Sequence, residues 1–445
     1  MENQVESSLI VGPDDPVPAG EATLLGLQHV LAMDVYVPPI ILAGMMAMGA
    51  ADSTGLLQST FLAAGIGTIL QTCFFMKMPV SQGPSFVPLG AAAGVVMASG
   101  GLKGNGMATL LGALVVGAIV LVLLGLSGAF QKIINTLVPA VVGGTIITCV
   151  GLSLIPSALN DNIFEATGNI YQNIELASIT ALTLLICVAI SIRFPLVQKL
   201  FKTGSIVIAL LVGTLVSASM GRFDWKSVAD SAWFSFPQRT MLHWGISFNL
   251  TSILTFIIIY AILTTETTGT WFAMGAVTNH KITSRQWNHG IIGEGLSCLV
   301  AALAGTTPVT GYSTNAGVIS ITGVASKRVF IAAGSWFIVL GFFAKLSAFL
   351  AAIPAPVIGG VFAIITVTIM LNGLNVIRQQ QTGESDLYII GLPIILTLAL
   401  VLLPSKVTNA APQMIQYLLG SPIAVAAITA IVLNLLMPSR HNKLA

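Results

Sequence analysis

Long apolar segments alternate with short polar loops along almost the whole chain. A helix that crosses a bilayer needs about 20 apolar residues. Fourteen segments approach or meet that length: 23–47, 54–76, 84–99, 106–128, 138–156, 175–193, 204–220, 249–275, 289–305, 314–325, 328–351, 354–374, 386–403 and 412–437. The third and tenth are short, and each follows a stretch that favours extended backbone. The pattern predicts an all-α polytopic membrane protein with 14 transmembrane segments and short β-strands in segments 3 and 10.

The stretch Thr306–Gly323 interrupts this pattern deep in the second half of the chain. It begins with a short β-like run, turns at Gly311, and is expected to start a helix near Thr314 and Asn315. Extended backbone at membrane depth is tolerated only where it is buried in protein or lines a cavity. A helix that starts there points its N–H groups and positive dipole end at the break. The stretch therefore predicts half of a binding site, the alternative being a simple loop between helices.

A second copy of this pattern lies in the first half of the chain. Pro79–Phe86, with the sequence PVSQGPSF, parallels Pro308–Asn315, with the sequence PVTGYSTN. Residues 141–144, VVGG, similarly parallel residues 357–360, VIGG. Two interrupted hydrophobic segments at matching places in two halves are the best sequence indication of a transporter's binding site.

The composition agrees with a membrane protein. Hydrophobic residues make up 55% of the chain and charged residues 8%, whereas a soluble domain carries about 25% charged residues. The four cysteines lie in apolar segments without metal-ligand spacing, and the chain has no Walker A loop and no nucleophile–base pair. We therefore expect no cofactor, no bound metal, no enzymatic activity and no nucleic-acid partner.

Loop charges predict the orientation in the membrane. An even number of segments places both termini on one side, and Lys and Arg are enriched in cytoplasmic loops. Twelve of these residues fall on the terminal side and five on the other. Residues 1–20 are acidic and Pro-rich, unlike a cleaved signal peptide. We expect a multi-pass protein of the cell (inner or plasma) membrane with both termini cytoplasmic.

Three acidic side chains lie inside predicted spans: Asp34, Glu266 and Glu294. Such residues are costly in a membrane and by default mark functional sites. Glu266 lies in the polar run TTETTGT, and Glu294 lies between two glycines. His29 in segment 1 is a further candidate. The alternative for each is a structural role, as a protonated carboxyl or a core histidine that bonds a neighbouring group.

At these residues the chain resembles the nucleobase–ascorbate transporter family, carriers of purines, pyrimidines or ascorbate coupled to protons or sodium. The family signature is an amide or acidic residue followed by Asn-x-Gly-x-x-x-x-Thr. Here Thr314 is followed by Asn315, Gly317 and Thr322. The resemblance covers nearly the whole chain, and its other matches are Gln28-His29, the break at Ser85-Phe86, Glu266 and Glu294. The run 322–326 is more similar to purine-type members, such as bacterial purine permeases, than to uracil-type members.

The resemblance implies a 7+7 inverted repeat with a core of segments 1–4 and 8–11 and a gate of segments 5–7 and 12–14. It also implies an elevator-like movement of core against gate, and a homodimer. The chain would then divide into a cytoplasmic N-terminal tail (1–20), the first half of the core domain (21–128), the first half of the gate domain (129–248), the second half of the core domain (249–351), the second half of the gate domain (352–437) and a cytoplasmic C-terminal tail (438–445).

The resemblance further assigns roles to residues. The substrate-binding candidates are Glu266, Thr314, Asn315, Phe86, Ser85, Ser313 and Thr270, and the proton-coupling candidates are Glu294, His29 and Asp34. Two positions depart from the family, which usually has Gln or Glu in place of Thr314 and often Asp or His in place of Thr270. The shorter Thr314 predicts a roomier site or a contact through water.

We therefore expect proton-coupled uptake of a nucleobase, most consistent with a purine of the xanthine, urate or guanine type. A carboxylate such as Glu266 accepts from the N–H edge of a base, and an amide such as Asn315 both donates and accepts. A buried carboxylate such as Glu294 can load a proton, because desolvation disfavours its charged form. The alternatives are a uracil or pyrimidine symporter, sodium as the coupling ion, and a sulfate-permease-like anion transporter. Glu266 beside the break argues against an anion site.

Overall fold

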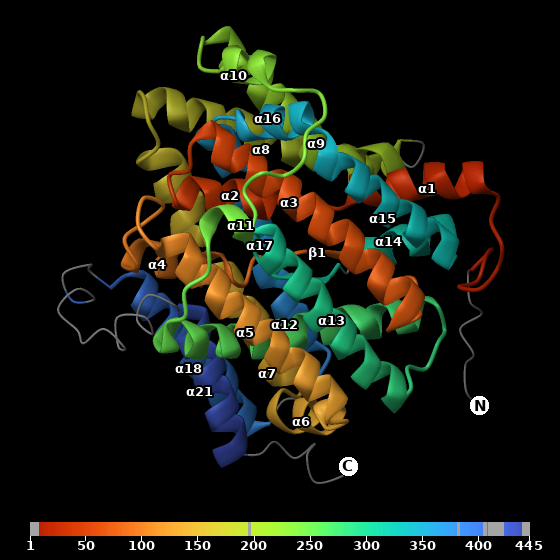
Figure 1. The fold of residues 1–445 in the computed structure, drawn as a ribbon. Coiled ribbons are helices and arrows are strands. Elements are labelled where there is room, and N and C mark those ends of the chain that lie inside the picture. Colours follow the sequence, from red (N-terminus) through yellow and green to blue (C-terminus); the bar gives the residue numbers. More distant parts are fainter. Residues whose placement is uncertain are drawn as a thin grey trace.

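The computed structural model describes residues 9–194, 197–312, 314–380, 383–403, 407 and 422–437. They form helices joined mostly by short loops, with one pair of short strands (Figure 1). The first half of the chain contains α1 (Ala19–Ala32), α2 (Val37–Met45), α3 (Ala50–Ile69), η1 (Leu70–Phe74), β1 (Gln82–Pro84), α4 (Leu89–Ala98), α5 (Gly106–Leu126), α6 (Phe130–Leu137), α7 (Ala140–Ser153), η2 (Ser157–Phe164), α8 (Ile170–Arg193) and α9 (Gln198–Ser219). The remainder contains α10 (Trp225–Asp230), α11 (Met241–Trp244), α12 (Leu250–Val277), α13 (Ser284–Ala304), β2 (Val309–Gly311), α14 (Thr314–Thr322), α15 (Lys327–Phe342), α16 (Ala344–Ala351), α17 (Ala355–Arg378), α18 (Glu384–Val401) and α21 (Pro422–Leu436).

Seven helices in the described residues are long and apolar enough to cross a membrane. They correspond to the predicted segments 54–76, 106–128, 138–156, 175–193, 249–275, 354–374 and 386–403. An eighth span results if α15 and α16 are counted together, although they meet at 76°. These apolar helices indicate a multi-pass membrane protein. Residues 412–421 of predicted segment 14 and the predicted C-terminal tail lie outside the described residues.

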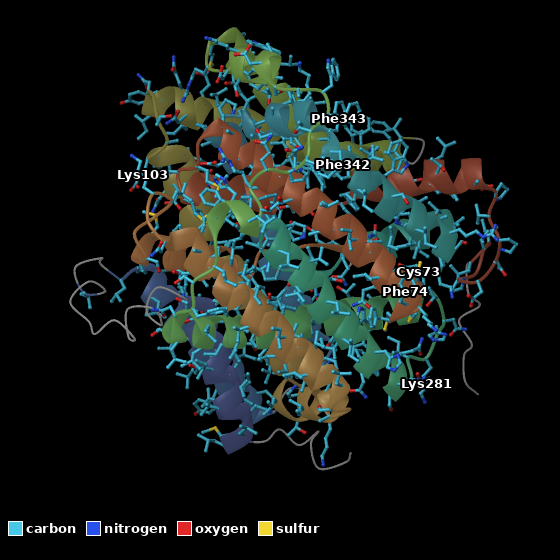
Figure 2. All side chains as sticks on the ribbon, viewed as in Figure 1. Cys73, Phe74, Lys103, Lys281, Phe342 and Phe343 are labelled. Atoms are coloured by element: carbon cyan, nitrogen blue, oxygen red, sulfur yellow. The ribbon has the colours of Figure 1, made fainter. Side chains whose placement is uncertain are left out.

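Two predicted segments are divided. Segment 1 is not the single helix 23–47, because α1 ends at Ala32 and α2 begins at Val37. Pro38 and Pro39 lack N–H groups, and prolines are best accommodated in the first turn of a helix. Segment 11 is divided at Phe343, whose φ and ψ of −84° and 77° are not helical. Figure 2 shows this residue next to its neighbour Phe342.

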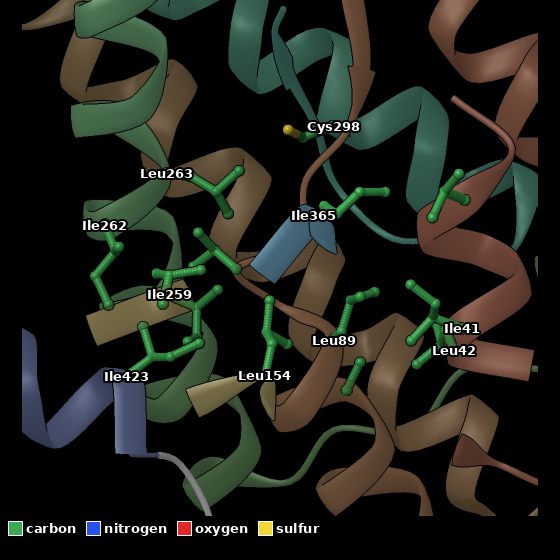
Figure 3. Close-up of a cluster of buried hydrophobic side chains, with 14 of the residues drawn as sticks. Ile41, Leu42, Leu89, Leu154, Ile259, Ile262, Leu263, Cys298, Ile365 and Ile423 are labelled. Atoms are coloured by element: carbon green, nitrogen blue, oxygen red, sulfur yellow. The ribbon is translucent and has the colours of Figure 1, made fainter. Parts of the chain in front are cut away.

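The helices pack into two groups. In the first, α13 lies against α5 and α3, and α15 lies against α3 and α1. This group also contains α2 and β1, which lie against α3; α4 and α12, which lie against α5; and β2, which lies against β1. In the second, α17 lies against α7 and α8, and α18 lies against α7 and α21. Figure 3 shows where apolar side chains of both groups meet. Ile41 and Leu89 of the first group lie in one buried cluster with Leu154, Ile365 and Ile423 of the second. The two groups therefore meet here through apolar surfaces.

Glycines bring α7 and α17 very close together. A Cβ atom added to Gly373 would lie 2.4 Å from the Thr148 nitrogen and 2.6 Å from the Gly144 oxygen. A Cβ added to Gly151 would lie 2.5 Å from the Met370 nitrogen. Membrane helices associate largely through van der Waals packing, so small residues at a crossing let the backbones approach. This helix pair therefore depends on the absence of side chains at the crossing.

The segment that precedes α1 is attached along the connection between α14 and α15. The Val11 N–H donates to the Gly323 carbonyl at 3.0 Å, and the Ala325 N–H donates to the Val11 carbonyl at 2.9 Å. The Lys327 N–H donates to the Pro13 carbonyl at 2.9 Å. These backbone bonds join the start of the described chain to the end of α14 and the start of α15.

Replacing Gly373 with Ala is expected to destabilise the protein by about 1–3 kcal/mol, because the new methyl group would meet the backbone of α7. The measurement is the midpoint of thermal unfolding of the purified protein in detergent. Gly391→Ala in α18 is the matched control, since a Cβ there meets nothing within 4 Å. Equal unfolding midpoints for the two variants would contradict the close approach of α7 and α17.

Candidate functional site

The two interrupted segments meet through their strands. β1 and β2 pair antiparallel, with Gln82 opposite Gly311 and Pro84 opposite Val309. All residues of both strands are buried. The predicted strands in segments 3 and 10 are thereby confirmed. Their pairing satisfies backbone groups that neither water nor lipid can reach.

Each strand leads into a short helix. α14 begins at Thr314, as the sequence predicted. α4 begins at Leu89, later than the start of the predicted segment 84–99, because Pro88 disfavours helical backbone in the residue before it. Each helix is about 15 Å long, roughly half the hydrocarbon thickness of a bilayer. Such half-helices can direct their N-terminal N–H groups at a ligand in mid-membrane.

Glu266 lies beside the break after β1. The Ser85 hydroxyl donates to Oε2 of Glu266 at 2.6 Å and accepts from the Val87 N–H at 3.1 Å. Among the described residues, nothing donates a hydrogen bond to Oε1. Glu266 is half-buried on α12. One carboxylate oxygen is therefore held in place, and the other is available to a ligand.

Several positions at or near the two breaks are incompletely packed although they belong to apolar segments. Phe86 is half-buried, and its ring stacks on Phe362 of α17 with centroids 6.2 Å apart and planes inclined by 19°. Thr314, the first residue of α14, is exposed, and so is Gly269, three residues after Glu266 on α12. No atom lies within 4 Å of a Cβ added to Gly269. Phe86 thus offers an aromatic face beside Ser85, which bonds Glu266, and Gly269 leaves free space on the helix of Glu266. Thr314 offers an exposed hydroxyl at the start of α14.

Glu294 lies in a closed network instead. It is 1% exposed, and its Oε2 accepts from Gln82 at 2.8 Å and from Gln71 at 3.4 Å. Its Oε1 accepts a short hydrogen bond from Thr267, whose hydroxyl also bonds the hydroxyl of Thr310. The carboxylate thus joins η1, β1, α12 and β2 from its position on α13.

Asn315 is fully buried and bonded within the protein. Its Nδ2 donates to the Ser81 hydroxyl at 2.6 Å and to the Met33 sulfur at 3.1 Å. Its Oδ1 lies 3.0 Å from Nδ1 of His29, whose ring packs on Phe330 with centroids 4.5 Å apart. Asn315 and His29 therefore join α14 to α1 and to the segment before β1. In this structure both polar atoms of Asn315 are bonded within the protein, and His29 is bonded through Nδ1.

Asp34 lies in the non-helical stretch between α1 and α2 and is half-buried. Tyr312, just after β2, is near enough to both Asp34 and Glu266 to interact with them electrostatically. The Tyr312 hydroxyl donates to the Pro84 carbonyl at 3.2 Å. A Cβ added to Gly83 would lie 2.6 Å from the Tyr312 ring. Tyr312 thus packs on β1, in the neighbourhood of two of the predicted acidic residues.

The hydroxyl of Thr270, a predicted substrate contact, bonds the backbone of the protein. The Thr270 hydroxyl donates to the Gly311 carbonyl at 2.9 Å, so it supports β2. Ser313 lies outside the described residues. The structure thus brings together Glu266, Ser85 and Phe86 near the break after β1 and leaves Thr314 exposed at the start of α14, whereas Glu294, Asn315, His29 and Thr270 bond other regions of the protein.

Sequence reasoning missed the partners of Glu294. Gln71 and Gln82 both donate to its carboxylate, and Thr267 and Thr310 extend the network. Gln71 lies in an apolar segment, where a lone amide is as unusual as a carboxylate. Gln82 lies in the repeat motif itself. The same search for polar residues inside spans would have found both glutamines, but not their common partner.

A family model described as the Permease family matches residues 20–406. The chain is 28% identical over 428 residues to the xanthine permease of Bacillus subtilis (strain 168), covering 94% of this chain and 93% of the relative. It is 27% identical over 427 residues to the uric acid permease PucK of the same organism, covering 92% and 94%. Its fold is similar to the transmembrane domain of a cyanobacterium bicarbonate transporter BicA, with a TM-score of 0.57, 15% identity, and coverage of 96% of this chain and 100% of that one.

Replacing Thr270 with Val removes the hydrogen bond to the Gly311 carbonyl at nearly constant volume. We expect a loss of about 0.5–1.5 kcal/mol of stability, with ligand affinity almost unchanged, because the hydroxyl supports β2. Thermal unfolding and equilibrium binding are the two measurements. Thr368→Val is the control, since that exposed hydroxyl bonds within its own helix. A large loss of affinity at unchanged stability would show that Thr270 contacts the ligand.

Proposed function

The chain belongs to the Permease family, as its resemblance to nucleobase–ascorbate transporters led us to expect, and on that premise we propose that it takes up a purine base together with protons. Bases of the xanthine, urate or guanine type are the proposed substrates. The observation that carries this proposal is Glu266, a half-buried carboxylate beside the break with one oxygen available. The similarity to a xanthine permease and a uric acid permease supports a purine.

The proposed site suits the edge and face of a base. The free oxygen of Glu266 accepts from ring N–H groups, and backbone N–H groups at the start of α14 donate to ring carbonyls. Phe86 offers a face for stacking. The exposed Thr314 lies where relatives usually have a longer amide or acid, so it contacts the base through water or leaves room for a ring substituent. In this proposal Asn315 and Thr270 hold the break in shape.

Glu294 is the proposed proton carrier. As a carboxylate it accepts from Thr267 at Oε1. A proton on Oε1 reverses that bond, because the acid then donates to Thr267, whose hydroxyl in turn donates to Thr310. Thr310 belongs to β2, which leads into α14. Protonation of Glu294 therefore changes the hydrogen bonds of Thr267 and Thr310, and so of the strand that leads into the proposed substrate-binding helix. Glu294 itself does not contact the base.

The two helix groups supply the proposed moving bodies. The first group contains both glutamates and both strands and corresponds to the core; the second corresponds to the gate. Phe86 of the core stacks on Phe362 of the gate. In an elevator-like movement this pair separates as the core carries the base across the membrane. We further propose a homodimer in the cell membrane with cytoplasmic termini.

Two other functions share this architecture. A pyrimidine symporter would use the same carboxylate, and competition by unlabelled purines and pyrimidines against a labelled purine separates the two substrate classes. The fold is also that of a bicarbonate transporter, but an anion site needs net positive charge, and Glu266 supplies the opposite. Replacing the proton gradient by a sodium gradient during uptake distinguishes the two coupling ions.

Glu266→Gln is expected to lower the affinity for the base by roughly 10- to 150-fold, because a charge-assisted hydrogen bond worth about 1.5–3 kcal/mol is lost. Binding of radiolabelled xanthine to purified protein is the measurement, with Glu165→Gln, an exposed carboxyl on a loop, as the control. Affinity for xanthine equal to that of the unmodified protein would remove Glu266 from the binding site.

Glu294→Gln is expected to retain base binding and to lose pH-dependent accumulation, while exchange of base across the membrane persists. An amide can direct its N–H toward Thr267 as the protonated acid does, so the variant is fixed in the neutral state. Uptake and counterflow into proteoliposomes with and without a pH gradient measure both properties. Asp34→Asn is assayed in parallel. If Glu294→Gln still concentrates the base and Asp34→Asn does not, the proton is carried by Asp34.

A further inference from the structure

A groove of about 430 Å³ lies between α1 and α15 and belongs to neither carboxylate site. Its apolar lining includes Ala22, Ile331, Ala332 and Val339. Val339 and several other lining residues are exposed, so the groove opens to the surroundings of the protein. Trp336 closes one side, where its indole N–H donates to the Thr23 carbonyl at 3.0 Å and joins the two helices.

The polar groups within this lining are already satisfied. The Thr23 hydroxyl donates to the Ala19 carbonyl at 2.7 Å, and the Ser335 hydroxyl donates to the Ile331 carbonyl at 2.9 Å. Both are hydrogen bonds within a helix, which direct the hydroxyl at its own backbone. Along α15 the groove therefore presents an apolar stripe.

One cationic group lies at the end of this stripe. Arg328 is exposed in the first turn of α15 and donates one hydrogen bond, from Nη1 to the Val17 carbonyl at 3.4 Å. Its neighbour Lys327 is paired with Asp14, whereas no carboxylate among the described residues pairs with Arg328. A guanidinium has five N–H donors. Most of its capacity to bind an anion is therefore unused.

The spacing along α15 matches a molecule with a charged head and an apolar tail. Arg328, Ile331, Ala332, Ser335 and Val339 follow one another at helical spacing on one face, over about 16 Å. In the orientation predicted from loop charges, the Arg328 end lies on the cytoplasmic side of the membrane. Basic sites between membrane helices on that side bind anionic lipid head groups.

We propose that this groove binds an anionic phospholipid, with its phosphate at Arg328 and an acyl chain along α15 toward Val339. A free phosphate would leave the apolar stripe uncovered. A second copy of the chain would cover the stripe, but it has no identified anionic group to pair with Arg328. The lipid would brace α15 against α1, the helix that carries His29 to Asn315. The proposal depends on the membrane location and not on the transported substrate.

The test uses the full-length protein in detergent with phosphatidylglycerol or phosphatidylcholine of identical acyl chains. Native mass spectrometry measures bound lipid, and thermal unfolding measures stabilisation. We expect phosphatidylglycerol to bind and stabilise more strongly. Arg328→Gln should weaken its binding about fivefold, whereas Arg285→Gln, an exposed arginine outside the groove, should leave it unchanged.

Ser335→Trp provides a second variant that keeps the charge and fills the groove at an exposed position. It should abolish selective lipid binding with Arg328 in place. Equal binding of the two lipids, or equal effects of the two arginine substitutions, would overturn the proposal. Full competition by inorganic phosphate would show a simple anion site. A dimer that Ser335→Trp dissociates would identify the groove as an interface between copies.

Discussion

The structure depends on two extended segments that satisfy each other's backbone inside a helical protein. Hydrocarbon offers no hydrogen-bond partners, so an interrupted membrane helix must find them in protein. β1 and β2 pair with each other, and the pairing extends at both ends, from the Ser85 N–H to the Pro308 carbonyl and from the Tyr312 N–H to the Ser81 carbonyl. Neither break is stable without the other. Their meeting joins the two halves of the chain and places two half-helices around one location.

The polar run on α12 links the two carboxylates of this location. Glu266 and Thr267 are adjacent, yet Glu266 has an available oxygen while Thr267 bonds the enclosed Glu294. β1 and the residue that follows it repeat this arrangement, because Gln82 bonds Glu294 and Ser85 bonds Glu266. In the proposed mechanism a base at one carboxylate and a proton at the other therefore act on the same short elements. Coupling then needs no direct contact between them.

Packing within and between the helix groups differs in kind. Within a group, backbones touch at glycines, as at Gly373 against α7 and at Gly65, where an added Cβ would lie 2.6 Å from the Gly334 carbonyl of α15. Such crossings fix the relative position of two helices closely. Between the groups, the contacts in Figure 3 are apolar side chains such as Leu89 and Ile365. This contrast is compatible with the proposed movement of one group against the other.

The sequence by itself determined that the chain is a membrane protein. It also determined most of the helical segments, both strands and the start of α14, because the hydrophobic pattern and the positions of Pro and Gly act locally along the chain. It also selected Glu266 and Glu294, since any carboxylate in an apolar segment is conspicuous. Only the tertiary structure decided that, among the described residues, one oxygen of Glu266 has no donor, while Glu294 accepts from two glutamines. The tertiary structure likewise decided that Asn315 bonds His29. Such partners lie on helices far apart in the chain, so they depend on how the helices pack and not on the composition of either segment.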